Sequence, residues 1–145
     1  MITILDKIYA YGHENILGTH NTTIELTKDK RLTKEGNCII GINATKACVD
    51  LSNELKIAIK NGKKIKIKLK IDDLQDCFYG YGDKDLKLLD KDDIVFRTSN
   101  YLSDRTVLIN CTKSSSDLKR NLLEKIKIPS KRLLIIFELE EINGK

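Results

Sequence analysis

Two histidines and three carboxylates are the side chains of this sequence that are best suited to chemistry. His13 and His20 are its two histidines, and Glu25 follows five positions after His20. Asp83 and Asp90 stand 70 positions after the two histidines. If the loops that carry them converge, imidazoles and carboxylates could bind a divalent transition metal or act as general acid and base. All five are therefore candidate catalytic residues, and the two histidines are candidate metal ligands.

A structural role for the histidines is the competing interpretation. The spacing of seven positions between them matches no standard metal-ligand motif. Imidazole nitrogens also form hydrogen bonds that hold turns together, and Thr22 and Thr23 are suitable partners close to His20. The sequence alone leaves both interpretations open.

Lysines beside predicted helix starts form a second group of candidates. Lys46 ends an Asn-Ala-Thr-Lys run at 43–46, and Lys113 ends an Asn-Cys-Thr-Lys run at 110–113. Each run lies between a predicted strand and a predicted helix, where free backbone N–H groups attract anions. We therefore expect Lys46 and Lys113 to bind an anion, with ordinary helix capping as the alternative.

A third group is a row of lysines at 64–70. Lys64, Lys66 and Lys68 alternate with isoleucine and leucine, and this period of two predicts a strand with one apolar and one cationic face. Tyrosine pairs at 9/11 and 79/81 have the same spacing and could stack on nucleobases. The row favours RNA as a partner, although lysines on a strand also protect a sheet edge or simply face water.

The charge distribution agrees with an anionic partner. Residues 1–71 hold 13 Lys and Arg against 7 Asp and Glu, and residues 72–145 hold 13 against 14. The formal net charge of +5 thus divides into +6 and −1, which gives the chain a basic first half.

Several classes of protein are disfavoured by missing motifs. The sequence has no Gly-x-x-x-x-Gly-Lys-Ser/Thr loop, no Gly-x-Gly-x-x-Gly and no Gly-x-Ser-x-Gly elbow. Its four cysteines form no Cys-x-x-Cys pair, so we expect reduced cysteines in the core instead of a zinc ribbon. With no bilayer-length apolar run and no signal layout, the expected location is the cytoplasm, without a membrane partner.

One pattern of elements is predicted twice along the chain. The order β-β-β-α-β fits residues 1–71 and again residues 72–145, with an offset that falls from 70 to 67 positions. We therefore predict an α+β fold, internally duplicated, in which two halves pack as one pseudo-two-fold domain over residues 1–145. Its strands would form either a mixed curved sheet or a barrel, with two helices.

Two runs in the first half resemble a known family. Residues 11–27 read Tyr-Gly-His-Glu-Asn-Ile-Leu-Gly-Thr-His-Asn-Thr-Thr-Ile-Glu-Leu-Thr, and residues 32–42 read Leu-Thr-Lys-Glu-Gly-Asn-Cys-Ile-Ile-Gly-Ile. They resemble the archaeal family known as domain of unknown function 371, with its Gly-His-x-Asn-Ile, Thr-His-x-Thr-Thr-x-Glu and Leu-Thr-x-x-Gly-Asp-Cys-Ile motifs. Asn37 stands where that family has Asp. The resemblance covers essentially the whole chain and implies an archaeal, cytoplasmic protein, but it implies no activity.

These observations lead to one leading function and two alternatives. The leading expectation is a binding module for RNA or another anionic or phosphorylated ligand, through the basic first half. The alternatives are a small metal-assisted enzyme that uses His13 and His20, and a subunit that binds only protein. The sequence identifies no cofactor and sets no oligomeric state.

Overall fold

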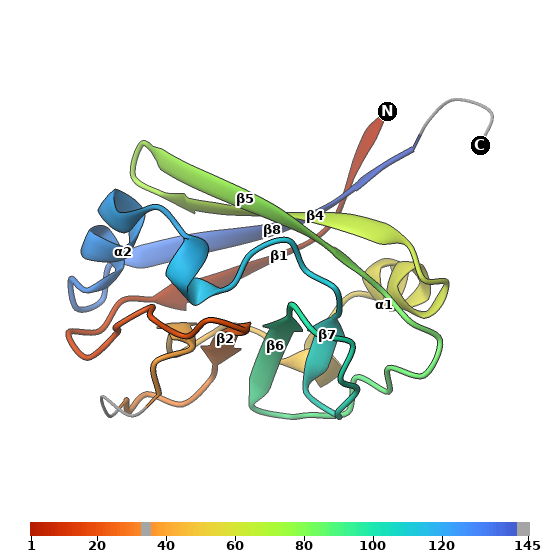
Figure 1. Cartoon of the computed structure of the whole chain (residues 1–145), viewed down its shortest axis with the longest axis horizontal. Coiled ribbons are helices and arrows are strands. Elements are labelled where there is room, and N and C mark those ends of the chain that lie inside the picture. Colours follow the sequence, from red (N-terminus) through yellow and green to blue (C-terminus); the bar gives the residue numbers. More distant parts are fainter. Residues whose placement is uncertain (33–35, 142–145) are drawn as a thin grey trace.

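The larger of two sheets contains four antiparallel strands. The computed structural model describes residues 1–32 and 36–141 of the chain, so residues 33–35 of the second motif run lie outside it. The sheet has the order β1-β8-β4-β5, seen along the upper part of Figure 1. Its strands are β1 (Ile2–Tyr11), β8 (Arg132–Glu140), β4 (Lys64–Ile71) and β5 (Leu74–Tyr81).

The smaller sheet lies below the larger one in Figure 1 and has the order β3-β2-β6-β7. Its central strands, β2 (Thr23–Thr27) and β6 (Asp93–Arg97), are antiparallel. Each has a short parallel neighbour, β3 (Ile39–Gly41) beside β2 and β7 (Thr106–Leu108) beside β6. β7 ends at Leu108, and two residues later Asn110 turns the chain with a positive φ of 51°.

Two helices connect the sheets in corresponding places. Short 3-10 turns, η1 (Cys48–Asp50) and η2 (Ser115–Asp117), precede α1 (Asn53–Lys60) and α2 (Arg120–Ile126). Leu51 and Leu118 have extended backbone, so each 3-10 turn is separate from the helix that follows it. Within the described residues, no helix is long and apolar enough to cross a bilayer.

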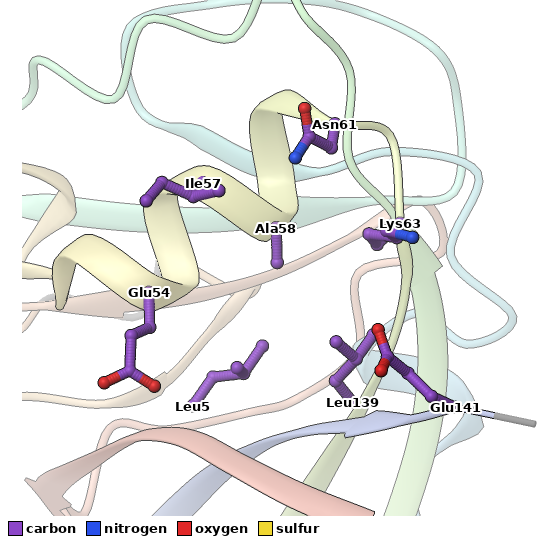
Figure 2. A pocket seen from close by; sticks show the side chains of 8 residues that line it. All are labelled: Leu5, Glu54, Ile57, Ala58, Asn61, Lys63, Leu139 and Glu141. Atoms are coloured by element: carbon purple, nitrogen blue, oxygen red, sulfur yellow. The ribbon is translucent and has the colours of Figure 1, made fainter. Parts of the chain in front are cut away.

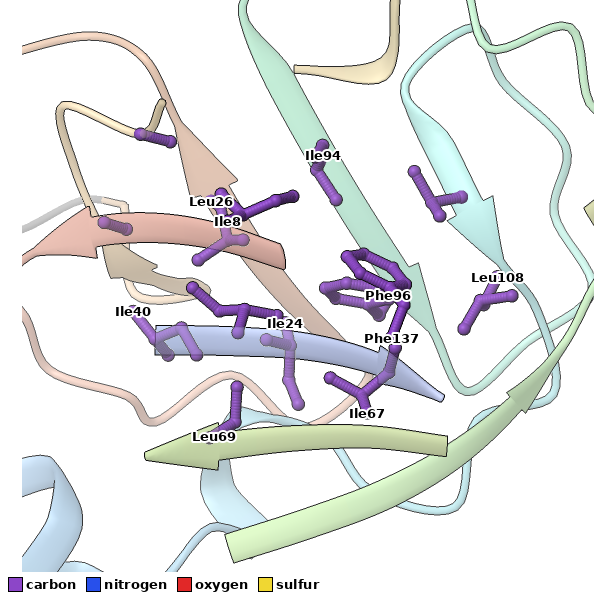
Figure 3. Packing of buried hydrophobic residues seen from close by; sticks show 14 of the residues in the cluster. Ile8, Ile24, Leu26, Ile40, Ile67, Leu69, Ile94, Phe96, Leu108 and Phe137 are labelled. Carbon is purple, nitrogen blue, oxygen red and sulfur yellow. The ribbon is translucent and has the colours of Figure 1, made fainter. Parts of the chain in front are cut away.

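The hydrophobic core fills the space between the two sheets and under the helices. Phe78 of β5, Phe96 of β6 and Phe137 of β8 are its largest fully buried side chains. The Phe96 ring lies 5.3 Å from that of Phe78 and 6.0 Å from that of Phe137 between ring centroids, so aromatic contacts join the sheets. Aliphatic side chains from both halves of the chain surround them (Figure 3).

The predicted α+β class, the two helices and the order of elements are confirmed, whereas a closed barrel is wrong. The strands form two sheets instead of one curved sheet. Edges of the two sheets meet at single bridges, Tyr11 with Ile42 and Tyr81 with Ile109. One bridge pairs too few backbone groups to continue a ladder, so the two sheets remain separate at these corners.

Gly12 and Gly82 permit a close approach between strand ends and helix ends. A Cβ atom at Gly12 would overlap the carbonyl oxygens of Ile126 and Ile128, and one at Gly82 would overlap that of Ile59. Because these atoms belong to rigid backbone, we expect Gly12→Ala and Gly82→Ala each to lower the free energy of unfolding by about 3 kcal/mol. Gly36→Ala is the control, since its Cβ would meet only flexible side-chain ends. Equal losses in chemical denaturation would contradict this explanation.

Candidate functional site

Both histidines hold turns through their Nδ1 atoms. Nδ1 of His13 accepts a hydrogen bond of 2.9 Å from the backbone N–H of Asn15. Nδ1 of His20 accepts from the backbone N–H groups of Thr22 and Thr23, each at 3.2 Å, and lies 3.0 Å from the Thr23 hydroxyl. A ring nitrogen that accepts these bonds carries no proton, so Nε2 carries it in the neutral ring.

Asp83 and Asp90 make the same bonds with carboxylate oxygens. Oδ1 of Asp83 accepts from the backbone N–H of Asp85 at 2.8 Å. Oδ2 of Asp90 accepts from the N–H groups of Asp92 and Asp93 at 3.1 and 2.6 Å. Imidazole and carboxylate therefore hold turns at corresponding places. No three His, Cys, Asp or Glu side chains among residues 1–32 and 36–141 are grouped to hold a metal ion.

Glu25 is the fifth candidate, and it belongs to a polar network on the smaller sheet. Only 6% of this residue is exposed. Its Oε1 lies 3.4 Å from Nη1 of Arg105, and the same Nη1 lies 3.1 Å from Oδ2 of Asp93. The thiol of Cys38 donates a long contact of 3.9 Å to Oε1. Sequence reasoning missed Arg105 and Asp93, because their approach to Glu25 depends on the pairing of β2 with β6 and of β6 with β7.

Burial controls the ionisation of Glu25. It raises the pKa of the carboxyl group to about 7, while the nearby Arg105 guanidinium opposes this rise and the Asp93 carboxylate adds to it. Burial also raises the pKa of the Cys38 thiol, with the Glu25 charge adding to that effect, so the thiol stays protonated and is a poor nucleophile.

Lys46 and Lys113 are each paired with a buried carboxylate of the chain itself. Nζ of Lys46 lies 2.7 Å from Oδ1 of Asp6, and Nζ of Lys113 lies 2.6 Å from Oδ1 of Asp76. Burial tends to raise the pKa of Asp76, but hydrogen bonds, the largest from Lys113, outweigh it and hold the pKa below its usual range. These two lysines thus stabilise the connections between strands and helices through ion pairs within the chain.

The lysine row occupies the outer face of the larger sheet, as the alternation predicts. Side chains of β4 alternate between the buried Ile65, Ile67, Leu69 and Ile71 and the lysines at 64, 66, 68 and 70. Lys64 and Lys70 are exposed, and Lys66 and Lys68 are half-buried. In the part of the chain that the structure describes, no helix or strand covers this side of the sheet (Figure 1).

Two tyrosines share this face and are covered by cations. Nζ of Lys64 lies 4.7 Å from the ring centroid of Tyr79, and Nζ of Lys66 lies 5.9 Å from it. Tyr9 is on the opposite edge strand, β1, and the guanidinium of Arg132 on the neighbouring β8 lies 4.7 Å from its ring centroid. These distances are those of cation–π contacts, so both rings help to hold the charges in place.

Glu138 of β8 is a second residue that sequence reasoning missed. It stands opposite Lys66 in the β4–β8 register, and only 5% of it is exposed. Oε2 lies 3.3 Å from Nζ of Lys68, whereas Oε1 is buried and has no hydrogen-bond partner among the described residues. Leu134, Ile136 and Glu138 are alternate residues of β8 and therefore share its outer face. An acid in this alternating series was the sequence signal for Glu138.

Two surface hollows lie near these elements. One of about 230 Å³ is on the lysine face and is lined by Lys64, Lys66, Tyr79 and Glu140. Another of about 290 Å³ is mainly apolar and lies between α1 and the ends of β1 and β8 (Figure 2). Of the predicted site residues, Lys64 and Lys66 line the first hollow, and none lines the second.

The fold and the site define a two-sheet α+β protein with a cationic, tyrosine-bearing sheet face. The family described as Domain of unknown function (DUF371) matches residues 8–140, so the chain belongs to this family, as its motif runs indicated. It is also 44% identical over 120 residues to "Uncharacterized protein MJ0206" of the archaeon Methanocaldococcus jannaschii. That match covers 83% of this chain and 89% of the relative.

The turn at His20 can be tested by substitution. His20→Asp should keep the free energy of unfolding within about 0.5 kcal/mol, because a carboxylate holds the corresponding turn at Asp90. His20→Ala removes the acceptor of two backbone N–H groups and should cost about 1 kcal/mol. Urea denaturation measures both, and an Asp variant as unstable as the Ala variant would refute the turn role.

The raised pKa of Glu25 makes stability depend on pH in a defined direction. From pH 4.5 to about 7 the folded chain keeps a proton on Glu25 that the unfolded chain releases, so stability falls as pH rises. This group alone should cost about 3 kcal/mol across the window. Glu25→Gln should remove that part of the slope, as urea denaturation at several pH values can measure. An unchanged slope would show that Glu25 is ionised in the folded chain.

Proposed function

We propose that this chain binds single-stranded RNA through the outer face of the larger sheet. The observation that carries the proposal is the sharing of one uncovered face by the β4 lysine row and the two cation-covered tyrosines. Alternate residues on a strand lie about 6.8 Å apart, so the lysines offer a regular line of charge to an extended polyanion. Most of the binding free energy would come from release of counterions by the phosphates.

The tyrosines suit bases better than phosphates. Base–aromatic stacking tolerates any sequence, because every base has a π-face. The Arg132 guanidinium over Tyr9 is itself planar and can stack on a base, and the flexible Lys64 can move from Tyr79 to a phosphate. The cations over the rings are therefore compatible with RNA binding.

The alternatives have less support. For the enzyme that uses His13 and His20, Nδ1 of each histidine is engaged in a turn, which leaves Nε2 for chemistry. An anion site at Lys46 or Lys113 would compete with the carboxylates of Asp6 and Asp76. No specific observation favours the subunit that binds only protein.

We also propose that residues 1–71 and 72–145 arose by duplication and form one domain. Asn43 and Asn110 share a φ of 51°. Hydroxyl groups of Thr45 and Thr112 accept from strands β1 and β5 at the same distance of 3.0 Å. Repeated bonds at repeated positions support a common origin for the two halves.

A charge-reversal variant tests the RNA proposal. Lys64 and Lys70 would be changed to Glu and Lys66 to Gln, and Lys68 would be kept, because a carboxylate at position 66 or 68 would stand beside Glu138. Affinity for a labelled RNA of about ten nucleotides should fall at least about tenfold, measured by fluorescence anisotropy. The slope of log affinity against log salt should fall by about 2, since each phosphate contact contributes about 0.7.

A matched control comes from the loop between β5 and β6. Lys84, Lys87 and Lys91 are exposed there, and changing Lys84 and Lys91 to Glu and Lys87 to Gln alters the net charge equally. This control should keep most of the affinity because the loop lies away from the lysine face. Equal losses in both variants would mean that only overall charge matters, and unchanged affinity in the first variant would exclude this face.

A further inference from the structure

Glu138 places an unpartnered acceptor on the proposed RNA-binding face. Its neighbours across the strands are Ile4 of β1 and Lys66 of β4. Lys68 pairs with Oε2 at 3.3 Å, and this leaves Oε1 buried without a hydrogen-bond partner in the described chain. Because buried carboxylate oxygens are nearly always hydrogen-bonded, this oxygen has the character of one that is completed by a ligand.

The lysine side chains that cover Glu138 can move. Lys66 and Lys68 flank the carboxylate, and a lysine side chain has four rotatable bonds. The ammonium of Lys66 lies within 5.9 Å of the Tyr79 ring centroid, so it is drawn toward the tyrosine. Glu138, Lys66 and Tyr79 are paired in register across β8, β4 and β5, so they form one row across the sheet. Lys66 and Tyr79 of this row line the hollow of about 230 Å³.

The chemistry of a carboxylate selects the group that can bind it. An ionised carboxylate accepts hydrogen bonds and donates none. Cytosine presents an exocyclic amino group at C4, whereas uracil presents a carbonyl oxygen at the same position. Glu138 does not line this hollow but lies directly beyond Lys66. When the Lys66 side chain moves aside, a base held against Tyr79 would therefore meet Glu138 favourably if it carries an amino group, and unfavourably if it carries the carbonyl.

We propose that Oε1 of Glu138 accepts a hydrogen bond from the exocyclic amino group of a bound base, so that the chain prefers cytosine to uracil in single-stranded RNA. This inference rests on the proposed RNA-binding function. It adds a base-reading contact to a face whose other contacts, with phosphates and ring faces, carry no sequence information.

The preference can be measured with oligocytidylate and oligouridylate of equal length. The wild-type chain should bind oligocytidylate about tenfold more tightly in fluorescence anisotropy. Glu138→Gln should reduce the ratio to within about twofold, since an amide can either accept from the amino group or donate to the carbonyl. Glu54→Gln is the matched control, because Glu54 is exposed on α1, does not line this hollow and undergoes the same change of side chain. It should keep the wild-type ratio.

A second measurement does not depend on folding of a variant. Oligocytidylate with N4,N4-dimethylated bases lacks the amino hydrogens and should bind the wild-type chain no better than oligouridylate. If neither unmodified oligomer binds, the proposed function fails. If both bind wild type equally, or if Glu138→Gln keeps the preference, this inference is overturned while RNA binding by the lysine face stands.

Discussion

Two buried carboxylates hold the larger sheet to the helices, and the rest of the fold depends on them. Asp6 binds the ammonium of Lys46 through Oδ1 and the backbone N–H of Ser52, the N-cap of α1, through Oδ2. Asp76 binds Lys113 and the N–H of Lys119 in the same way at the start of α2. A buried charge is stable only when such donors surround it, so each aspartate fixes a strand, a loop and a helix together.

This requirement decides which polar groups remain for a ligand. Lys46 and Lys113 form ion pairs with Asp6 and Asp76, and each histidine uses Nδ1 to hold its turn. Glu25 is enclosed in a network with Arg105 and ionises only near neutral pH. The lysine row differs because its ammonium groups lie on a face that no described helix or strand covers. Among residues 1–32 and 36–141, Lys68 alone of this row forms an ion pair with a carboxylate. The structure thus separates polar residues that build the fold from those that can meet a partner.

The sequence predicted this face well, because a strand turns alternate side chains to opposite sides whatever surrounds it. The period of two at 64–71 was enough to place the lysines opposite the core. The division into two sheets could not be predicted in this way, since it depends on single long-range bridges at Tyr11 and Tyr81. The acceptor role of Nδ1 in His13 and His20 depends on turn geometry, and the burial of Glu138 depends on side chains from neighbouring strands.

The two halves of the chain differ where the two central strands of the larger sheet, β8 and β4, lie side by side. Lys64 pairs with Tyr81, and Arg132 pairs with Tyr11, so these two cations begin corresponding strands. Along the outer face, the next residues of β4 are lysines, whereas those of β8 are Leu134, Ile136 and Glu138. The face therefore has a cationic strand beside an apolar strand that ends in a buried acid. Asp83 and Asp90 make the same kind of turn bonds as His13 and His20, whereas on the sheet face the two strands present different side chains. A face with distinct strands can bind an asymmetric chain in one direction, which a symmetric face could not specify.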